Sequence, residues 1–280
     1  MSTGAVLKAV KVAVAQVPVA INDVEANLAT VLGTMREAAR LGARMVVFPE
    51  CALTGYLQVS LEECRSVALS RKSPELDKLR HRARELDLVT VVGYLEQEDG
   101  RVYNTALLVD PGGNEGQYRK AHLPYLGADR FVTPGSNEPV VVDTGLGGVG
   151  LSICYDLRFP EWARCLTLAG ASIIAHPTNW AVSAGYVAKI LPQARALENS
   201  IFLLAANRGD DERGTEWFGG SSIVAPTGEV LATAPRGNHL VVSEIDLSLA
   251  RRSKVIFEPE TFELDLYGDR RPDLYGRIVQ

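Results

Sequence analysis

The chain has 280 residues, of which 46% are hydrophobic and 22% are charged, and its net charge is −5. This balance is typical of a soluble globular protein with a sizeable core, and it disfavours nucleic acid or an anionic membrane surface as a partner. No apolar run approaches the roughly 20 residues that a membrane helix needs. The N-terminal residues contain no apolar core of a secretory signal and lead into a strand, so we expect a cytoplasmic protein.

The cysteines show neither a disulfide framework nor a metal site. Cys51, Cys64, Cys154 and Cys165 form no CxxC pair and lie at no metal-ligand spacing. In a cytoplasmic protein they are expected to be reduced thiols. The cysteines therefore indicate no metal site.

Short apolar runs rich in Val and Ile recur along the chain, each bounded by Pro, Gly, Asn or Asp. Such runs are typical of strands that are buried on both faces of a sheet. The predicted strands cover residues 12–14, 45–48, 89–94, 106–109, 149–153, 172–175, 201–205 and 222–224.

Helical patterns lie between several of these runs. Asn22 with Glu25 resembles a capping box that starts one helix, and Ser73 followed by Pro74 starts a second. Two more helices are predicted over residues 160–170 and 187–199, the latter containing Pro192. Strands that alternate with helices predict an α/β fold. Without repeats or linkers, residues 1–280 form a single predicted domain.

Polar groups follow four of the predicted strands, at the end where α/β proteins bind ligands. Glu50 follows residues 45–48, Cys154 follows 149–153, Asn179 follows 172–175 and Asn207 follows 201–205. One such coincidence carries little weight, whereas four together indicate a site.

Cys154 by itself is ambiguous, because most buried cysteines are inert. A cysteine nucleophile needs a base, which is usually histidine, and His122 or His176 could serve. A glutamate such as Glu50 could serve instead, if burial raises its pKa. Lys120, in the basic stretch YRKAHLP, could then stabilise the charge on a carbonyl oxygen. The residues alone leave both bases open.

Three stretches in order resemble the motifs of the nitrilase superfamily of carbon–nitrogen hydrolases: FPECALTGY at 48–56, YRKAHLP at 118–124 and CYDLRFPE at 154–161. The resemblance runs from the first strand, VAVAQ, to the RRPDLYG tail. It implies a four-layer α-β-β-α sandwich that assembles as a homodimer or a higher homo-oligomer. It also implies Cys154 as nucleophile, Glu50 as general base and acid, and Lys120 as stabiliser of the tetrahedral intermediate, with the Tyr155 backbone N–H completing the oxyanion hole. These roles need no metal and no organic cofactor, so we expect neither.

The sequence departs from the family at one position. Many members carry a second glutamate six residues before a Pro-Gly pair, and here that position is Ala128. Asp129 follows it and is the candidate to replace the missing carboxylate from a shifted loop. Further candidates for substrate binding are Tyr56, Arg158, Asn179 and Trp180.

The substrate class is predicted only in outline. Tyr-Asp after Cys154 resembles the amidase-type branches, whereas true nitrilases usually have Trp-Glu there. We expect a small aliphatic or ω-amide as substrate, with an N-carbamoyl compound as the alternative. A catalytically silent binding protein would require a broken triad, and a Cys–His thiol enzyme would not need Glu50. Residues 268–280 are predicted to form a tail that contacts a partner subunit.

Overall fold

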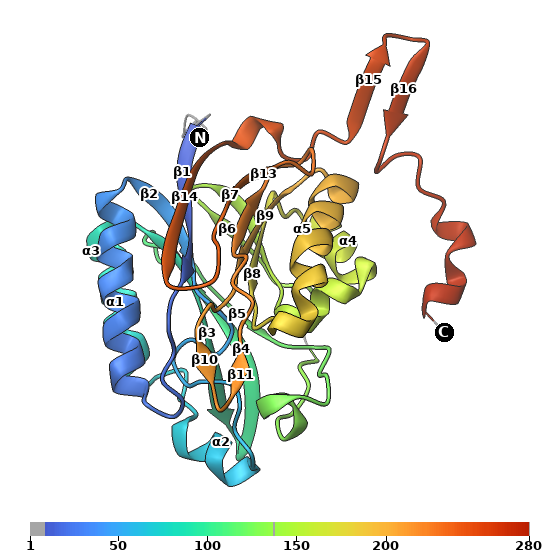
Figure 1. Ribbon diagram of the computed structural model, residues 1–280. Helices are drawn as coiled ribbons and strands as arrows, with labels where there is room; N and C mark the ends of the chain where they lie inside the picture. The colour runs from blue at the N-terminus through green and yellow to red at the C-terminus, as the bar shows by residue number, and fades with distance from the viewer. Residues whose placement is uncertain (1–8, 137, 280) are drawn as a thin grey trace.

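The chain folds into a four-layer α-β-β-α sandwich, in which two sheets face each other and helices cover their outer faces (Figure 1). The computed structural model describes residues 9–136 and 138–279, so the N-terminal lead-in predicted over residues 1–8 lies outside them. The layered architecture confirms the predicted fold. Within the described ranges, every helix is too short or too polar to cross a bilayer.

The first sheet has six strands in the order β14-β1-β2-β3-β4-β5. The central strands β1, β2 and β3 run parallel, and the others pair antiparallel with their neighbours. The strands are β1 (Ala9–Gln16), β2 (Ala43–Val47), β3 (Val89–Glu98), β4 (Arg101–Val109), β5 (Glu115–Arg119) and β14 (His239–Asp246).

The second sheet also has six strands, in the order β13-β12-β9-β8-β7-β6. Its parallel centre is β7, β8 and β9, and the remaining pairings are antiparallel. The strands are β6 (Val141–Thr144), β7 (Gly147–Leu151), β8 (Ile173–Pro177), β9 (Phe202–Ala206), β12 (Ser222–Val224) and β13 (Val230–Thr233).

All eight predicted runs fall within or at the ends of these strands, and four strands were missed. The missed strands, β5, β6, β13 and β14, are the outermost strands of the two sheets. Each has residues that are partly open to solvent. β5 has no apolar run, whereas the short runs at residues 140–142, 230–232 and 240–242 in or beside the other three were overlooked.

Helices cover the outer face of each sheet. The helices α1 (Val24–Arg40) and α3 (Pro74–Leu86) pack on the first sheet, and α4 (Pro160–Leu168) and α5 (Gly185–Asn199) pack on the second. A third apolar layer, made mostly of Val, Ile, Leu and Ala from both sheets, fills the space between them. This central layer holds the two sheets in fixed relation, so their strand ends can present one common site.

The predicted start of α1 is wrong by one residue. The N-cap is Asp23, whose carboxylate accepts a hydrogen bond from the Ala26 N–H at 3.0 Å, so Asn22 and Glu25 do not form the capping box. Asn22 adopts a positive φ of 63°, and its side chain donates to Glu63 at 2.6 Å. The tertiary contact with Glu63 thus replaces the capping role that the local pattern predicts for Asn22.

The predicted helix with Pro192 begins earlier than expected and is not interrupted. α5 starts at Gly185, and Pro192 lies inside it on the buried face. The described residues also form shorter elements: α2 (Leu61–Val67), six 3₁₀ turns, a small hairpin of β10 (Asp211–Glu212) and β11 (Thr215–Glu216), and a hairpin of β15 (Lys254–Glu258) and β16 (Phe262–Asp265). The β15–β16 hairpin extends away from the sandwich, and the C-terminal segment runs back on the side of α4, with which it lines a pocket (Figure 1).

Gly93 in β3 allows the turn after β2 to pack closely against the sheet. A Cβ at this position would lie 2.5 Å from the Cys51 nitrogen, 2.6 Å from the Pro49 carbonyl oxygen and 2.8 Å from the Glu50 Cα. These separations are shorter than van der Waals contact, and the obstructing atoms belong to the backbone. Glu50 therefore reaches its position only because residue 93 has no side chain.

We expect Gly93→Ala to lower the free energy of unfolding by about 3 kcal/mol, because the turn must move to relieve the overlap. Urea denaturation followed by tryptophan fluorescence measures this change. Gly33→Ala is the matched control: it lies on an exposed face of α1 with no atom within 4 Å of the added Cβ. That substitution should raise the free energy of unfolding by about 0.5–1 kcal/mol. Equal stability of the two variants would contradict the steric account.

Candidate active site

Four side chains from separate segments meet beyond the carboxyl ends of the strands. Glu50 follows β2, Lys120 follows β5, Cys154 follows β7, and Asp129 lies in the 3₁₀ turn η1 (Gly127–Arg130). β5 points the same way as β3 because two antiparallel pairings separate them. Side chains from both sheets thus meet at one place beyond the strand ends, where strand pairing no longer constrains them.

Lys120 lies between two carboxylates in a fully buried cluster. Its Nζ is 2.7 Å from Glu50 Oε1 and 2.5 Å from Asp129 Oδ2. Desolvation lowers the pKa of Lys120, but the charges of Asp129 and Glu50 outweigh it and hold that pKa well above its usual value. Lys120 is therefore a permanent cation at neutral pH.

Burial also changes the protonation of Glu50. Desolvation raises the pKa of its carboxyl above 4.5, and the Lys120 charge opposes the rise only in part. The Oε2 atom of Glu50 is buried and has no hydrogen-bond partner among the described residues. Glu50 thus combines a raised pKa with one unoccupied carboxylate oxygen, as a proton acceptor requires.

Cys154 occupies a sharp turn that follows β7. It has a φ of 44° and is the first residue of the 3₁₀ turn η2 (Cys154–Arg158). Asp156 stabilises this turn, because its Oδ2 accepts hydrogen bonds from the Ile153 N–H and the Tyr118 hydroxyl, each at 2.8 Å. The polar residues after the strand therefore serve to fix the turn that presents the thiol.

The Cys154 thiol is protonated at neutral pH. Desolvation, followed by the negative charge of Glu50, raises its pKa to about 12. A thiol with this pKa supplies almost no thiolate by itself at pH 7, so nucleophilic chemistry here requires a base that takes the proton.

Three of the predicted substrate-binding residues join the cluster. The Tyr56 hydroxyl donates to Asp129 Oδ2 at 2.9 Å, and the Asn179 side chain donates to the Glu50 backbone carbonyl at 3.0 Å. Asp129 contacts Lys120 directly, although Ala128 occupies the position where many family members have glutamate. Asp129 pairs with Lys120 and not with its neighbour Arg130, which lies over the Phe131 ring.

The other predicted residues lie farther out. Arg158 is exposed and donates to the Tyr186 hydroxyl at 3.0 Å, rather than pairing with Asp156 or Glu161. Trp180 is 4% exposed and packs in the core beside His176, with the ring centroids 5.5 Å apart. Trp180 is therefore a core residue that packs near the site.

Tyr155 follows Cys154 in η2, and its side chain is partly exposed while its backbone lies at the turn. Each of the two candidate histidine bases has one ring nitrogen in contact with a side chain other than Cys154. His122 Nδ1 lies 2.7 Å from Asp156 Oδ1, and His176 Nδ1 lies 2.7 Å from the Ser152 hydroxyl. Desolvation lowers the pKa of His176 to about 3, so it is neutral and a weak base. His176 Nε2 is buried without a partner among the described residues, so its low pKa, rather than its contacts, disfavours His176 as the base. The charge of Glu50 acts directly on Cys154, which favours Glu50.

Asn104 is a member of the cluster that the sequence analysis missed. Its Nδ2 donates to Glu50 Oε1 at 2.7 Å and to Asp129 Oδ1 at 2.9 Å. The signal was present, because Asn104 is a polar residue inside the strand that continues into the apolar run 106–109. An amide there must find buried partners or destabilise the fold.

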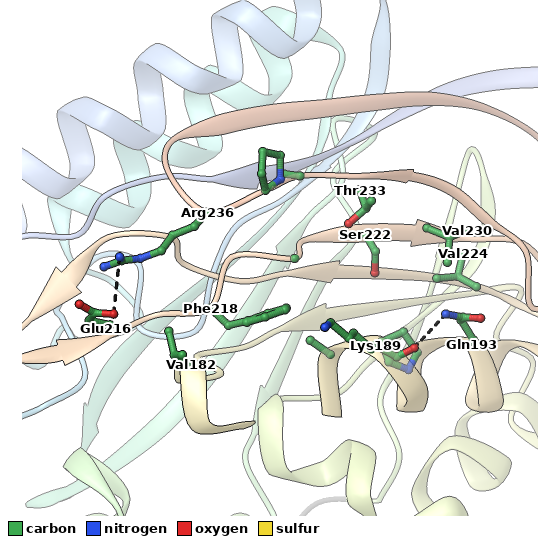
Figure 2. Close-up of a pocket in the computed structure, with 15 residues that line it drawn as sticks. Val182, Lys189, Gln193, Glu216, Phe218, Ser222, Val224, Val230, Thr233 and Arg236 are labelled. Atoms are coloured by element: carbon green, nitrogen blue, oxygen red, sulfur yellow. Dashed lines mark hydrogen bonds and ion pairs between the residues drawn. The ribbon is translucent and has the colours of Figure 1, made fainter. Parts of the chain in front are cut away.

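A cavity of about 630 Å³ lies away from this cluster, between α5 and the strands β12 and β13 (Figure 2). Lys189 and Gln193 of α5 line one side, and Phe218 and Val230 contribute apolar surface. The residues that line it within the described chain include no cysteine and no histidine. Its Ser222 hydroxyl has no adjoining base, so we place the candidate active site at the Glu50 cluster.

Within residues 9–136 and 138–279, no group of three or more His, Cys, Asp or Glu side chains could hold a metal ion. The cluster of Glu50, Lys120 and Asp129 contains a cation of its own, Lys120, between the two carboxylates.

An α-β-β-α sandwich with glutamate, lysine and cysteine at its strand ends defines a hydrolase that acts on carbon–nitrogen bonds other than peptide bonds. The chain belongs to the carbon-nitrogen hydrolase family, whose model matches residues 11–255. Within the nitrilase superfamily it is a member of the amidase type, as its relatives indicate.

The relatives span nearly the whole chain. A protein from Pyrococcus abyssi named nitrilase is 38% identical over 272 residues, which cover 96% of this chain and 100% of the relative. An (R)-stereoselective amidase from Pseudomonas sp is 34% identical over 261 residues, covering 92% of this chain and 90% of the relative. Among solved structures, a glutamate-to-glutamine mutant of the amidase from Nesterenkonia sp. AN1 superposes with a TM-score of 0.79 at 27% identity, covering 98% of this chain and 99% of that one. That structure shows covalent addition of the acetamide moiety of fluoroacetamide at the active-site cysteine.

Proposed function

We propose that the protein hydrolyses a small aliphatic or ω-amide through a thioester on Cys154. Glu50 takes the thiol proton, and the sulfur attacks the amide carbon. Lys120 and the Tyr155 N–H stabilise the oxyanion, and Glu50 then protonates the leaving group, which departs as ammonia. Glu50 next takes a proton from water, whose oxygen attacks the thioester carbon. The carbon–sulfur bond then breaks, the carboxylic acid leaves, and Glu50 returns its proton to the sulfur.

One observation supports this mechanism above the others. The only unoccupied carboxylate oxygen in the buried cluster described above is Glu50 Oε2, and its group has a raised pKa beside a thiol whose pKa is about 12. A neutral thiol with a carboxylate base and a fixed ammonium group has all the functions that amide hydrolysis requires. The amidase names of the Pseudomonas and Nesterenkonia relatives support the same reaction.

Ammonia release from a panel of compounds tests the proposal, with the Cys154→Ala protein as the blank. The panel contains short aliphatic amides, ω-amides, N-carbamoyl amino acids and nitriles. Mass spectrometry of the intact protein during turnover, followed by peptide mapping, should locate an acyl group on Cys154. Release of carbon dioxide together with ammonia would identify the N-carbamoyl alternative. A panel without turnover and without adduct would support a catalytically silent protein instead.

The assembly of the protein belongs to the same proposal. The β15–β16 hairpin extends from the sandwich (Figure 1) and exposes a row of apolar side chains, with the Phe257 and Phe262 rings stacked at 4.4 Å. Water-exposed apolar surface of this kind favours a protein contact. A second copy of the chain is the proposed partner, which makes the protein a homodimer or a larger homo-oligomer. The predicted contact in residues 268–280 is thereby extended to the hairpin before it; Gln280 lies outside the described residues.

Two truncations test this assembly. The Tyr267 hydroxyl donates to the Asn199 carbonyl at 2.6 Å, so a chain that ends at residue 268 keeps this anchor and the hairpin. A chain that ends at residue 253 loses both. We expect light scattering after gel filtration to show an oligomer for the full chain. The chain ending at residue 253 should form particles with fewer copies. A full-length monomer, or an unchanged oligomer in both truncations, would refute the proposed contact.

A further inference from the structure

The two oxygens of the Glu50 carboxylate have different surroundings. Oε1 accepts two hydrogen bonds, one from Lys120 Nζ and one from Asn104 Nδ2, each at 2.7 Å. Oε2 is equally buried and accepts none from the described residues. Since lone pairs that already hold donors are poor proton acceptors, the two oxygens differ in basicity.

Asn104 is held so that only its amide NH₂ can face the carboxylates. Nδ2 donates to Glu50 and also to Asp129 Oδ1 at 2.9 Å, while Oδ1 lies 3.6 Å from the Cys51 sulfur. Its backbone carbonyl accepts the Lys120 N–H at 2.8 Å, which fixes the strand beside the lysine. Exchanging the amide oxygen and nitrogen would place an oxygen against two carboxylates, so the orientation is set by the network.

We propose that Asn104 is a positioning residue that, together with Lys120, occupies Glu50 Oε1 and leaves Oε2 as the atom that accepts the Cys154 proton. Asn104 also keeps Glu50 ionised, because its N–H stabilises the charged carboxylate. This inference rests on the proposed role of Glu50 as the base. Asn104 acts through Glu50 and is not itself assigned a contact with substrate.

The charges around Glu50 explain why one neutral donor matters. Two carboxylates share a single ammonium group in a site without bulk water. Loss of the Asn104 N–H leaves each carboxylate with one donor fewer, so the pKa of Glu50 should rise further. The titratable groups that interact electrostatically with Glu50 are Lys120, Asp129, Cys154, Cys51 and Tyr56.

The test is the pH dependence of kcat/KM for Asn104→Leu, a substitution of similar size that removes the donor. Because Glu50 acts as the base only when ionised, activity falls below its pKa. We expect the acidic limb to move to higher pH by about one unit, so that kcat/KM falls by up to about tenfold on that limb. The loss should lie in kcat, with KM nearly unchanged, and should diminish at alkaline pH.

Thr105→Val is the matched control. Thr105 lies next to Asn104 in β4, and the substitution removes a buried hydrogen bond to a different glutamate. The Thr105 hydroxyl donates to Glu96 Oε2 at 2.8 Å, outside the cluster. This variant should keep the wild-type acidic limb even if it unfolds more easily. If Asn104→Leu does not fold, Asn104→Ala leaves space for a water molecule and should move the limb in the same direction by a smaller amount.

An acidic limb in the Asn104 variants that matches the limb of Thr105→Val would overturn the inference. Failure of the proposed function is a separate result, since it is detected by full turnover in Glu50→Gln. Wild-type kinetics in Asn104→Leu with no turnover in Glu50→Gln would reject only the positioning role.

Discussion

Glu50→Gln should lower kcat/KM by about 10⁴-fold, because the substitution keeps the shape of the side chain and removes its ability to accept a proton. The same group is proposed to serve three times: on the thiol, on the leaving ammonia and on the hydrolytic water. The pKa of about 12 for Cys154 leaves no thiolate to compensate at neutral pH. Steady-state ammonia release measures the loss.

The control for Glu50→Gln is the reactivity of the thiol itself. The glutamine mutant of the Nesterenkonia amidase carries an acetamide group from fluoroacetamide on its cysteine. We expect Glu50→Gln to form the corresponding adduct at Cys154 slowly, which would show that the site is intact while turnover is lost. Full turnover in Glu50→Gln, with loss of activity in His122→Asn or His176→Asn, would instead identify a Cys–His enzyme.

Lys120→Met should damage both stability and catalysis. Breaking a buried ion pair typically costs about 3–5 kcal/mol of unfolding free energy, because the partners are left as buried charges. Loss of an oxyanion donor typically lowers kcat by about 10²- to 10³-fold, and the misplaced Glu50 adds to that loss. Urea denaturation and ammonia release measure the two effects on one preparation.

The stability loss in Lys120→Met should depend on pH in a defined direction. The pKa of Glu50 is already raised in the folded protein, and loss of the Lys120 charge raises it further. A carboxyl group with a raised folded pKa favours the folded state fully below its unfolded pKa of about 4, and this contribution disappears as pH rises through the folded value. The variant should therefore approach wild-type stability near pH 4 and differ most at neutral pH.

Asp129→Asn in the Lys120→Met background provides the matching control. It removes one of the two carboxylates that share the lysine, so the double variant should recover part of the stability without recovering activity. A Lys120→Met protein with wild-type stability at pH 7 would show that the cluster is not held by the ion pairs.

Much of the fold and the proposed triad could be predicted from the sequence. Central strands are buried on both faces, so they appear as continuous apolar runs, and the polar residues at their ends mark the site. Glu50, Lys120 and Cys154 were identified in this way and through the family motifs. This information is present in the sequence because the burial of a strand and its end are both determined by neighbouring residues in the chain.

The tertiary structure alone decided the rest. The edge strand β5 has no apolar run in its sequence, so only its pairing with β4 defines it. Asn22 was assigned to a cap by its neighbours in sequence, but Glu63 competes for its side chain. Asn104 was missed because its partner Glu50 lies 54 residues away in the chain. Asp129 was a candidate from the sequence, and the structure supplied its contact with Lys120. Asn104 and the residues that follow β2 and β5 meet because these strands belong to one sheet, and the local pattern of each strand does not encode their order in it.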